Sequence, residues 1–531
     1  MMAMRDAGAG VQARIRRLLN MFMWAFIGLA IGLAYIVGWR GNYLAMHARN
    51  PRQVAIEKSI ERGGIYAANG EVLAGNKLAG RPPGRTLRVY FGPRSLVHIV
   101  GYSHDRYGKT GIELALNSQL LGLPPGFLGV PVVGLVPGPG SRQPQPRGAG
   151  VRRQGEKPRG NDIILTIDPE LQAAAEAALG RRNGAVVVLD PATGAVLASV
   201  SYPAFDANRL DAVWPDITQD PSSPFINRAT SGLYPPGSVF KIIVASAAIE
   251  TGLVGPEDMF VCNGSIDVNG RRISCPGGRA HGRVNLASAL ALSCNVAFIQ
   301  VARKMGGRRL SDFARRFGFN REIPFDLHVN EGRFPTFRGE GSTGDPGGAG
   351  ARNGADARDG AGDNENLLAE AAIGQGPVLV TPLHMAMIAA AIANRGVMMR
   401  PYVVSLVRRG GSSETLWRYV PGRVSRAVSI NTAARMRDLL VDAVESGTGW
   451  RSAIEGISVA GKTGTAQNPE GAPHAWFVGF APAEKPRFVI SVIVENGGPG
   501  GSVAAPVARR VLEFALHREE GVFHGRRNAG E

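Results

Sequence analysis

The hydrophobic pattern divides the chain into one uninterrupted apolar run near its start and a long remainder of short, alternating strand-like and helix-like patterns. The apolar run covers residues 18–39, with no charge and a single polar interruption at Asn20. As a helix this run would be about 33 Å long, enough to cross the hydrocarbon layer of a bilayer. Arginines crowd the residues before it, whereas Arg40 is the only cation in the eight residues that follow. This asymmetry predicts a cytoplasmic tail over residues 1–17 and an extracytoplasmic position for everything after the run.

Two other interpretations of the apolar run are a cleaved signal peptide and a buried core helix. The run is longer than the usual apolar part of a signal peptide, and no clear small-residue cleavage site follows it. We therefore expect an uncleaved, single-pass anchor in the cytoplasmic membrane.

Residues 40–160 are predicted to form a small, β-rich, non-catalytic module that ends in a linker. The segment 63–75 has the pattern of strand, turn and strand around Asn69-Gly70. Residues 136–160 are rich in Pro, Gly and Arg, a composition typical of an extended linker.

A more regular pattern covers residues 161–520 and predicts a second domain. A strand pattern at 164–168 is followed by an amphipathic helix over 169–179, with Asp168 as its cap and Pro169 at its first position. Five further strands are expected at 184–190, 194–201, 456–464, 474–481 and 487–495. Their short connections favour an antiparallel sheet, and helical patterns fill 236–320 and 366–395. The predicted fold class is α+β, an antiparallel sheet flanked by helices with a helical subdomain.

Two segments of low structural content interrupt or follow this domain. Residues 339–366 are nearly devoid of apolar groups, which predicts a disordered insertion because such a segment cannot bury a core. Residues 521–531 are expected to be a short tail.

The net charge of +17 raises the possibility of nucleic-acid binding. Nucleic-acid binders concentrate Lys and Arg on one stripe with interleaved aromatic residues. Here the basic residues are spread along the whole chain and aromatic residues make up only 7%, so we predict no nucleic-acid partner. Attraction to anionic lipids or acidic wall polymers fits this charge better.

The three cysteines leave two alternatives open. Cys262 and Cys275 bracket a Gly-containing stretch that can turn back on itself, so they are candidates for a disulfide in an exterior location. Free buried thiols are the other alternative, and Cys294 is expected to be a packing residue. His281 and His474 have no partner at metal-ligand spacing, and H-E-x-x-H is absent, so the sequence predicts no metal and no cofactor.

The first candidate for chemistry is S-x-x-K, formed by Ser238 and Lys241 after Pro235-Pro236-Gly237. The segment that follows is apolar on all sides, which predicts an enclosed helix with Ser238 in its first turn. Lys241 would lie on the same face one turn further on. Loss of solvation would lower the proton affinity of this amine and allow it to activate the hydroxyl of Ser238.

Two further polar groups follow in order. Ser293 and Asn295 form S-C-N inside an apolar helical stretch, where they can reach into one cavity or serve only as caps. A strand candidate ends in a K-T-G-T sequence that can hold a carboxylate, formed by Lys462, Thr463, Gly464 and Thr465. The glycines of that strand allow another backbone to approach closely.

The three motifs in this order resemble the penicillin-binding and serine β-lactamase superfamily, whose signature is S-x-x-K, S-x-N and K-T-G. The segments RGGIYAANGEVLA (62–74), NRATSGLYPPGSVFK (227–241), GQGPVLVTPLHMA (374–386) and GKTGTAQ (461–467) are similar to the monofunctional, class B transpeptidases. The resemblance covers nearly the whole chain and is greatest to a subgroup with a short N-terminal region.

This resemblance implies a peptidoglycan D,D-transpeptidase that is inhibited covalently by β-lactams. Ser238 would attack the carbonyl of the penultimate D-alanine of a stem peptide, with Lys241 as base and Ser293 as proton relay. Asn295 would bond the substrate backbone, and the K-T-G-T residues would grip the terminal carboxylate. Because residues 41–160 are too short for a glycan polymerase, the resemblance also implies a separate membrane glycosyltransferase partner.

Other functions of the same fold remain open at this point. A D,D-carboxypeptidase differs only in the acceptor, which is water instead of an amine. A non-enzymatic protein of a wall-building complex or a β-lactam sensor would share the domain. The intact motifs argue against a dormant site.

Overall fold

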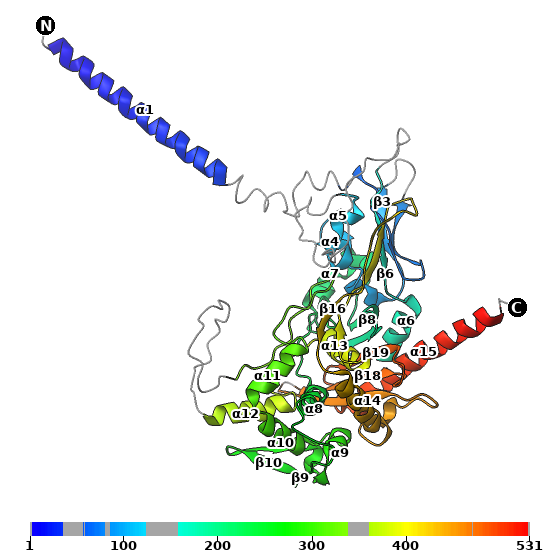
Figure 1. Cartoon of the computed structure of the whole chain (residues 1–531). Coiled ribbons are helices and arrows are strands. Elements are labelled where there is room, and N and C mark those ends of the chain that lie inside the picture. The colour runs from blue at the N-terminus through cyan, green and yellow to red at the C-terminus, as the bar shows by residue number, and fades with distance from the viewer. Residues whose placement is uncertain are drawn as a thin grey trace.

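The computed structural model describes residues 3–35, 57, 59–79, 85–123, 158–337, 361–469 and 471–528. Helix α1 (Ala3–Tyr35) contains a segment, Arg16–Tyr35, that is long and apolar enough to cross a membrane. The predicted span 18–39 thus lies in a helix up to residue 35, and its last four residues lie outside the described residues. Figure 1 shows α1 at the N-terminal end of the chain.

A five-stranded antiparallel sheet forms the centre of the larger domain. Its strand order is β17-β18-β19-β7-β8, with bounds Ala460–Asn468, Gly471–Ala481, Phe488–Val494, Gly184–Leu189 and Val196–Tyr202. All neighbours pair antiparallel, which confirms the predicted arrangement. The α+β fold class is also confirmed.

Both faces of this sheet are buried because apolar residues occupy consecutive strand positions. Val186 and Val188 pack with helices α6 (Pro169–Leu179) and α15 (Gly500–Asn528). Val187 contributes instead to the cluster that contains the helical subdomain. Helix α6 has the predicted bounds because Asp168 accepts hydrogen bonds from the N–H groups of Glu170 and Leu171.

The helical subdomain lies against the second face of the sheet. Its helices are α8 (Lys241–Glu250), α9 (Leu286–Ala291), α10 (Asn295–Met305), α11 (Gly307–Arg316), α12 (Ala361–Ala372), α13 (Pro382–Ala393) and α14 (Ile430–Glu445). Helix α12 corrects the predicted insertion 339–366, because residues 361–366 are its first turns. Residues 339–360 lie outside the described residues.

The helical pattern expected over 236–320 is wrong in its middle, where short strands replace it. They are β9 (Phe260–Cys262), β10 (Ser265–Val268), β11 (Arg271–Ser274) and β12 (Gly282–Val284). They form two two-stranded sheets, β10-β11 and β12-β9. In Figure 1 this strand region lies with α10 at the end of the molecule opposite β3.

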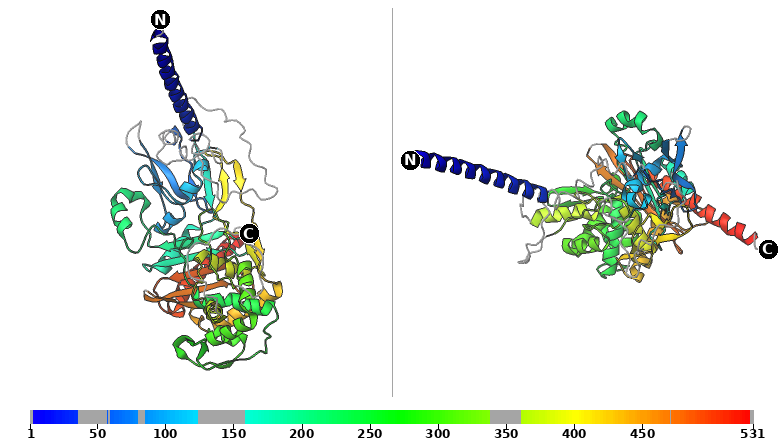
Figure 2. Two further views of the ribbon diagram at one scale, coloured as in Figure 1. Left: turned by 90° about the vertical axis from the view of Figure 1, so that its left-hand side faces the viewer. Right: turned by 90° about the horizontal axis from the view of Figure 1, so that it is seen from above.

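A second, six-stranded sheet joins segments that are far apart in the sequence. Its order is β15-β14-β6-β1-β2-β3, with bounds Thr415–Arg418, Val404–Arg408, Asp162–Leu165, Ile65–Tyr66, Val72–Ala79 and Arg85–Tyr90. The turn expected at Asn69-Gly70 connects β1 and β2. The expected boundary at residue 161 therefore falls inside this sheet, because β6, β14 and β15 follow it in the chain. In the left view of Figure 2, the blue strands of this sheet lie toward the N-terminal helix, and the green helices of the subdomain lie toward the opposite end of the molecule.

The remaining elements are short. They are η2 (Arg94–His98), β4 (Ser103–His104), β5 (Gly108–Lys109), α4 (Gly111–Ala115), α5 (Asn117–Leu120), η3 (Ala207–Arg209), α7 (Leu210–Gln219), η4 (Gly237–Phe240), η5 (Pro276–Gly278), β13 (Val397–Met399), β16 (Arg423–Arg426) and η6 (Trp450–Ser452).

Near the six-stranded sheet, Glu113 of α4 is fully buried between two arginines. Arg62 Nε and Arg88 Nε donate to it at 2.5 and 2.6 Å. This triad braces the N-terminal strands against α4.

Candidate active site

Ser238 lies on the short 3-10 turn η4 that precedes helix α8. The turn is fixed from two sides. The Gly237 N–H donates to the carbonyl of Gly374 at 2.8 Å, and Gly237 has a φ of 56°. A side chain at position 237 would come within 2.8 Å of the Thr465 carbonyl, so only glycine fits there. Ser238 itself is half-buried, although residues 241–248 of α8 are all buried.

Lys241, at the start of α8, joins the first two motifs. Its side chain is fully buried, and Nζ donates to the Ser293 carbonyl at 2.7 Å and to Asn295 Oδ1 at 2.7 Å. Its contact with Ser293 Oγ is 3.3 Å. Burial lowers the pKa of Lys241 to about 7, while Cys294 and Cys275 act in the opposite direction. A large fraction of this amine is therefore uncharged near neutral pH.

Ser293 lies in the turn between α9 and α10 and has a φ of 58°, in the left-handed region. This conformation is unfavourable for a residue with a side chain and persists only when its surroundings hold it. Here it directs the Ser293 carbonyl and hydroxyl toward the same amine. Asn295, the first residue of α10, also donates through Nδ2 to the Ser274 carbonyl at 2.8 Å. The S-C-N sequence thus spans a helix-helix turn, not a continuous helix.

The K-T-G-T residues lie on edge strand β17. Lys462 is fully buried, and its Nζ donates to the Thr463 carbonyl at 3.0 Å and to Thr448 Oγ1 at 3.4 Å. Burial lowers the pKa of Lys462 well below its ordinary value, and the charge of Lys241 acts in the same direction.

Strand β17 runs directly beside the turn that carries Ser238. A side chain at Gly464 would come within 2.9 Å of the Pro236 carbonyl and 3.1 Å of Val239, so the strand can approach η4 this closely only with glycine there. Thr465 is exposed, and its Oγ1 accepts from the Gly500 N–H at 3.3 Å. The structure therefore brings all eight candidate residues of the three motifs to one region.

One residue at this site was missed from the sequence. Thr448 Oγ1 lies 2.6 Å from Thr463 Oγ1 and also contacts Lys462. Its only signal is a hydroxyl between two glycines in the stretch that follows helix α14. Thr448 can be recognised as a residue of this site only when the position of β17 beside this turn is known. The G-Q-G loop at 374–376 also contacts the site, through Gly374 and the turn at Gly237.

The three cysteines are unbridged and buried, so the free-thiol alternative describes this structure and the candidate disulfide is not formed. Cys262 Sγ and Cys275 Sγ lie 3.6 Å apart. Sequence spacing shows no metal-ligand partner for His281, but the fold brings its Nδ1 to 3.4 Å from Cys262 Sγ. His474 accepts through Nδ1 from the Asn496 N–H at 3.1 Å, outside this group.

Fold and motifs together define a serine transpeptidase domain, and comparison with known families agrees. The family described as penicillin binding protein transpeptidase domain matches residues 184–513. The chain belongs to the class B penicillin-binding proteins.

Relatives align over most of the chain. It is 34% identical over 496 residues to peptidoglycan D,D-transpeptidase PbpA of Mycolicibacterium smegmatis, covering 88% of this chain and 91% of PbpA. PbpA of Mycobacterium tuberculosis is 32% identical over 540 residues, covering 96% of this chain and 100% of the relative.

Solved structures agree with this alignment. The ceftriaxone acyl-enzyme complex of M. tuberculosis penicillin-binding protein A has a TM-score of 0.73 at 33% identity, covering 87% of this chain and 99% of the other. A D,D-transpeptidase domain from Eggerthella lenta has a TM-score of 0.72 at 34% identity, with the same coverage.

Proposed function

We propose that this protein is a membrane-anchored peptidoglycan D,D-transpeptidase that works through an acyl-enzyme on Ser238. The observation that carries the proposal is the position of the Lys241 amine. It is buried one turn after Ser238 and bonded to both Ser293 and Asn295. A buried amine with a pKa of about 7 is a base suited to neutral pH, which an ordinary lysine is not.

In the proposed reaction, Ser238 Oγ attacks the carbonyl of the penultimate D-alanine of a stem peptide while Lys241 accepts its proton. The terminal D-alanine leaves as the amine, with its proton supplied through Ser293, whose Oγ is 3.3 Å from Lys241 Nζ. The amine of a neighbouring stem then takes the acyl group and releases Ser238. The N–H groups of Ser238 and Thr465 would stabilise the developing oxyanion.

The remaining motif residues are proposed to bind the donor peptide. Asn295 would hold its backbone, and Lys462, Thr463 and Thr465 its terminal carboxylate. The hydroxyl pair of Thr448 and Thr463 supports this role, because it fixes one carboxylate-binding hydroxyl beside the Lys462 amine.

Relatives support both the substrate class and the inhibitors. Relatives in M. smegmatis and M. tuberculosis are named peptidoglycan D,D-transpeptidases, and the M. tuberculosis penicillin-binding protein A forms acyl-enzymes with ceftriaxone and imipenem. By the same chemistry β-lactams acylate this protein, and Ser238 is the proposed site. The D,D-carboxypeptidase alternative uses the same acyl-enzyme and differs only in the acceptor.

The proposed location is the cytoplasmic membrane, with α1 as a single-pass anchor and the catalytic domain on the outer side. The apolar segment Arg16–Tyr35 and the arginines that precede it support this orientation. A membrane glycosyltransferase is the proposed partner that supplies the glycan strands.

Labelling with a fluorescent penicillin tests the nucleophile. The full-length protein in detergent should be labelled, and Ser238→Ala should abolish the label. Ser246→Ala is a matched control, because Ser246 lies in helix α8, which follows the turn of Ser238, and its hydroxyl is buried without a hydrogen-bond partner among the described residues. A label that survives in the Ser238 variant would refute the assignment.

Product analysis tests the acceptor. With lipid-linked substrate and a glycan polymerase, a transpeptidase gives cross-linked stem-peptide dimers. Trimmed stems without cross-links would instead identify a carboxypeptidase.

A further inference from the structure

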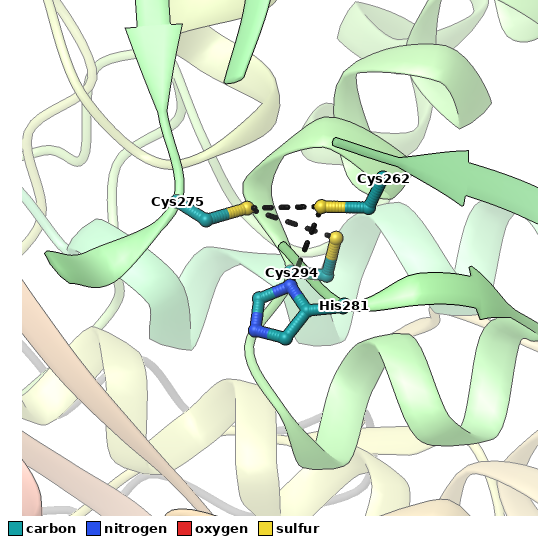
Figure 3. A group of neighbouring side chains, drawn as sticks. All are labelled: Cys262, Cys275, His281 and Cys294. Carbon is teal, nitrogen blue, oxygen red and sulfur yellow. Dashed lines mark hydrogen bonds between the residues drawn. The ribbon is translucent and has the colours of Figure 1, made fainter. Parts of the chain in front are cut away.

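Three cysteines and one histidine meet beside the S-C-N turn. The β10–β11 hairpin folds back at Asn269-Gly270 and returns the chain from Cys262 to Cys275. Pairing of β12 with β9 sets Gly282 opposite Cys262, which brings the adjacent His281 to the same place. Cys294, the N-cap of α10, completes the group, and Figure 3 shows the four side chains pointing toward one another.

The spacing of their donor atoms fits one tetrahedral ion. Zinc bonds of about 2.3 Å to sulfur and about 2.0 Å to nitrogen imply tetrahedral edges of about 3.8 Å between sulfurs and about 3.5 Å between sulfur and nitrogen. The Sγ atoms of Cys262 and Cys275 are 3.6 Å apart, and those of Cys275 and Cys294 are 3.8 Å apart. His281 Nδ1 is 3.4 Å from Cys262 Sγ, and all four donor atoms lie within 4.8 Å of one another.

We propose that Cys262, Cys275, His281 and Cys294 form a structural zinc site. Three thiolates and an imidazole are the ligands of a closed, four-coordinate zinc centre, with no position left for substrate. A disulfide explains the group less well, because it would use two of the three thiols and leave the third thiol and His281 without a role. A disulfide also requires a sulfur-sulfur distance of about 2.05 Å, whereas the sulfurs here are spaced as ligands.

A crosslink at this place would stabilise a part of the fold that has little sheet structure of its own. Residues 260–284 form two sheets of only two strands each, and most residues of β11 are exposed. Isolated two-stranded hairpins are at best marginally stable in water. Zinc would connect β9, the end of β11, the segment before β12 and α10, and so reinforce the small apolar cluster around Val268 and Ile299 that holds β10 against α10.

The site is also connected to the catalytic motifs, an inference that rests on the proposed function. Cys294 lies between Ser293 and Asn295, and the Asn295 amide bonds the Ser274 carbonyl next to Cys275. The metal would therefore hold the left-handed turn at Ser293 that presents both residues to Lys241. Zinc is a positioning element here and takes no part in the bond changes.

Metal analysis of the full-length protein tests the site directly. Protein purified without chelators should hold about one zinc per chain. After exchange with Co²⁺ alone it should show the visible bands of a tetrahedral cobalt-thiolate centre. His281→Ala and Cys262→Ser should lose metal and alter these bands, whereas His517→Ala, an exposed histidine of α15, should change neither. Zinc-free protein, or unchanged cobalt bands in the His281 variant, would overturn the proposal.

Thiol counting and labelling separate the remaining outcomes. Protein unfolded in the presence of a chelator should yield three alkylatable thiols, whereas a single thiol under the same conditions would show a disulfide and refute the site. Zinc removal should slow penicillin labelling by on the order of tenfold, because displaced catalytic groups lose rate steeply. Unchanged labelling of metal-free protein would refute the positioning role.

The metal content is measured without acylation, and Ser238→Ala should keep its zinc, so failure of the proposed function is distinguishable from failure of this site.

Discussion

The pH dependence of acylation is the most direct test of the role assigned to Lys241. With a pKa of about 7, about half of the Lys241 amine is uncharged at pH 7. An exposed lysine with a pKa of 10.5 would be uncharged in about 3 molecules in 10,000 at that pH. Burial thus supplies roughly a thousandfold more free base.

The direction of the pH effect follows from which form is active. Protonated Lys241 cannot accept the Ser238 proton, so the acylation rate should rise with pH and level off above about 7. The rate should fall to about one tenth of the plateau at pH 6 and about one hundredth at pH 5. Stopped-flow acylation with a chromogenic cephalosporin, carried out from acid to alkaline pH, measures this limb.

A charge-conserving substitution provides the control. Lys241→Arg keeps the cation but removes the titratable amine, and should reduce acylation on the order of 10²- to 10⁴-fold at every pH. Lys485→Arg, an exposed lysine before β19, should leave the profile unchanged. A flat profile between pH 5 and 8, or a limb near the ordinary lysine pKa, would refute the reasoning.

Three further substitutions test the supports of the site. Thr448→Val removes the hydroxyl bonded to Thr463 and should slow acylation about tenfold, the equivalent of about 1.4 kcal/mol. The pH at which the acylation rate falls should not move, and Thr448→Ser should restore the rate. Glu113→Ala leaves two buried arginines unpaired and should cost about 3–5 kcal/mol in a denaturant titration, and a loss under 1 kcal/mol would contradict the bracing role. Gly374→Ala should abolish labelling because its Cβ would overlap the turn before Ser238, whereas Gly252→Ala, also at positive φ but with open space around it, should label normally.

Local signals predicted the sheet and its covering helix well. Helix α6 starts and ends where a cap, a first-turn proline and Gly180 require it. Strand β7 is a continuous apolar run, and β8 and β19 are apolar runs interrupted only by buried serines, as expected for strands buried on both faces. These elements follow from neighbours in the sequence, so a single sequence suffices for them.

Pairings between distant segments were not predictable in the same way. Strand β14 (Val404–Arg408) joins the N-terminal module by pairing with β6, more than two hundred residues earlier in the chain. Nothing in its own sequence identifies that partner. The helical prediction fails over residues 260–284 because each of the four strands there has only three or four residues, too few for a period of two to be recognised.

The zinc ligands were missed for a related reason. Successive ligands are thirteen, six and thirteen residues apart, unlike the short C-x-x-C pairs that identify zinc sites in a sequence. Only the β10–β11 hairpin and the β9–β12 pairing bring these distant residues together in space. The motif residues were accessible from sequence because their order along the chain matched a known family.

The two buried lysines are the proposed base and the proposed carboxylate receptor of one site. Each amine is deprived of solvent, and the positive charge of Lys241 disfavours a charge on Lys462. A substrate carboxylate beside Lys462 would stabilise its charged form, since an opposite charge at close range favours ionisation. The resulting cation would in turn disfavour protonation of Lys241. With Lys241 as the proposed base and Lys462 as the proposed carboxylate receptor, substrate binding and base activation are coupled through the charges of these two amines.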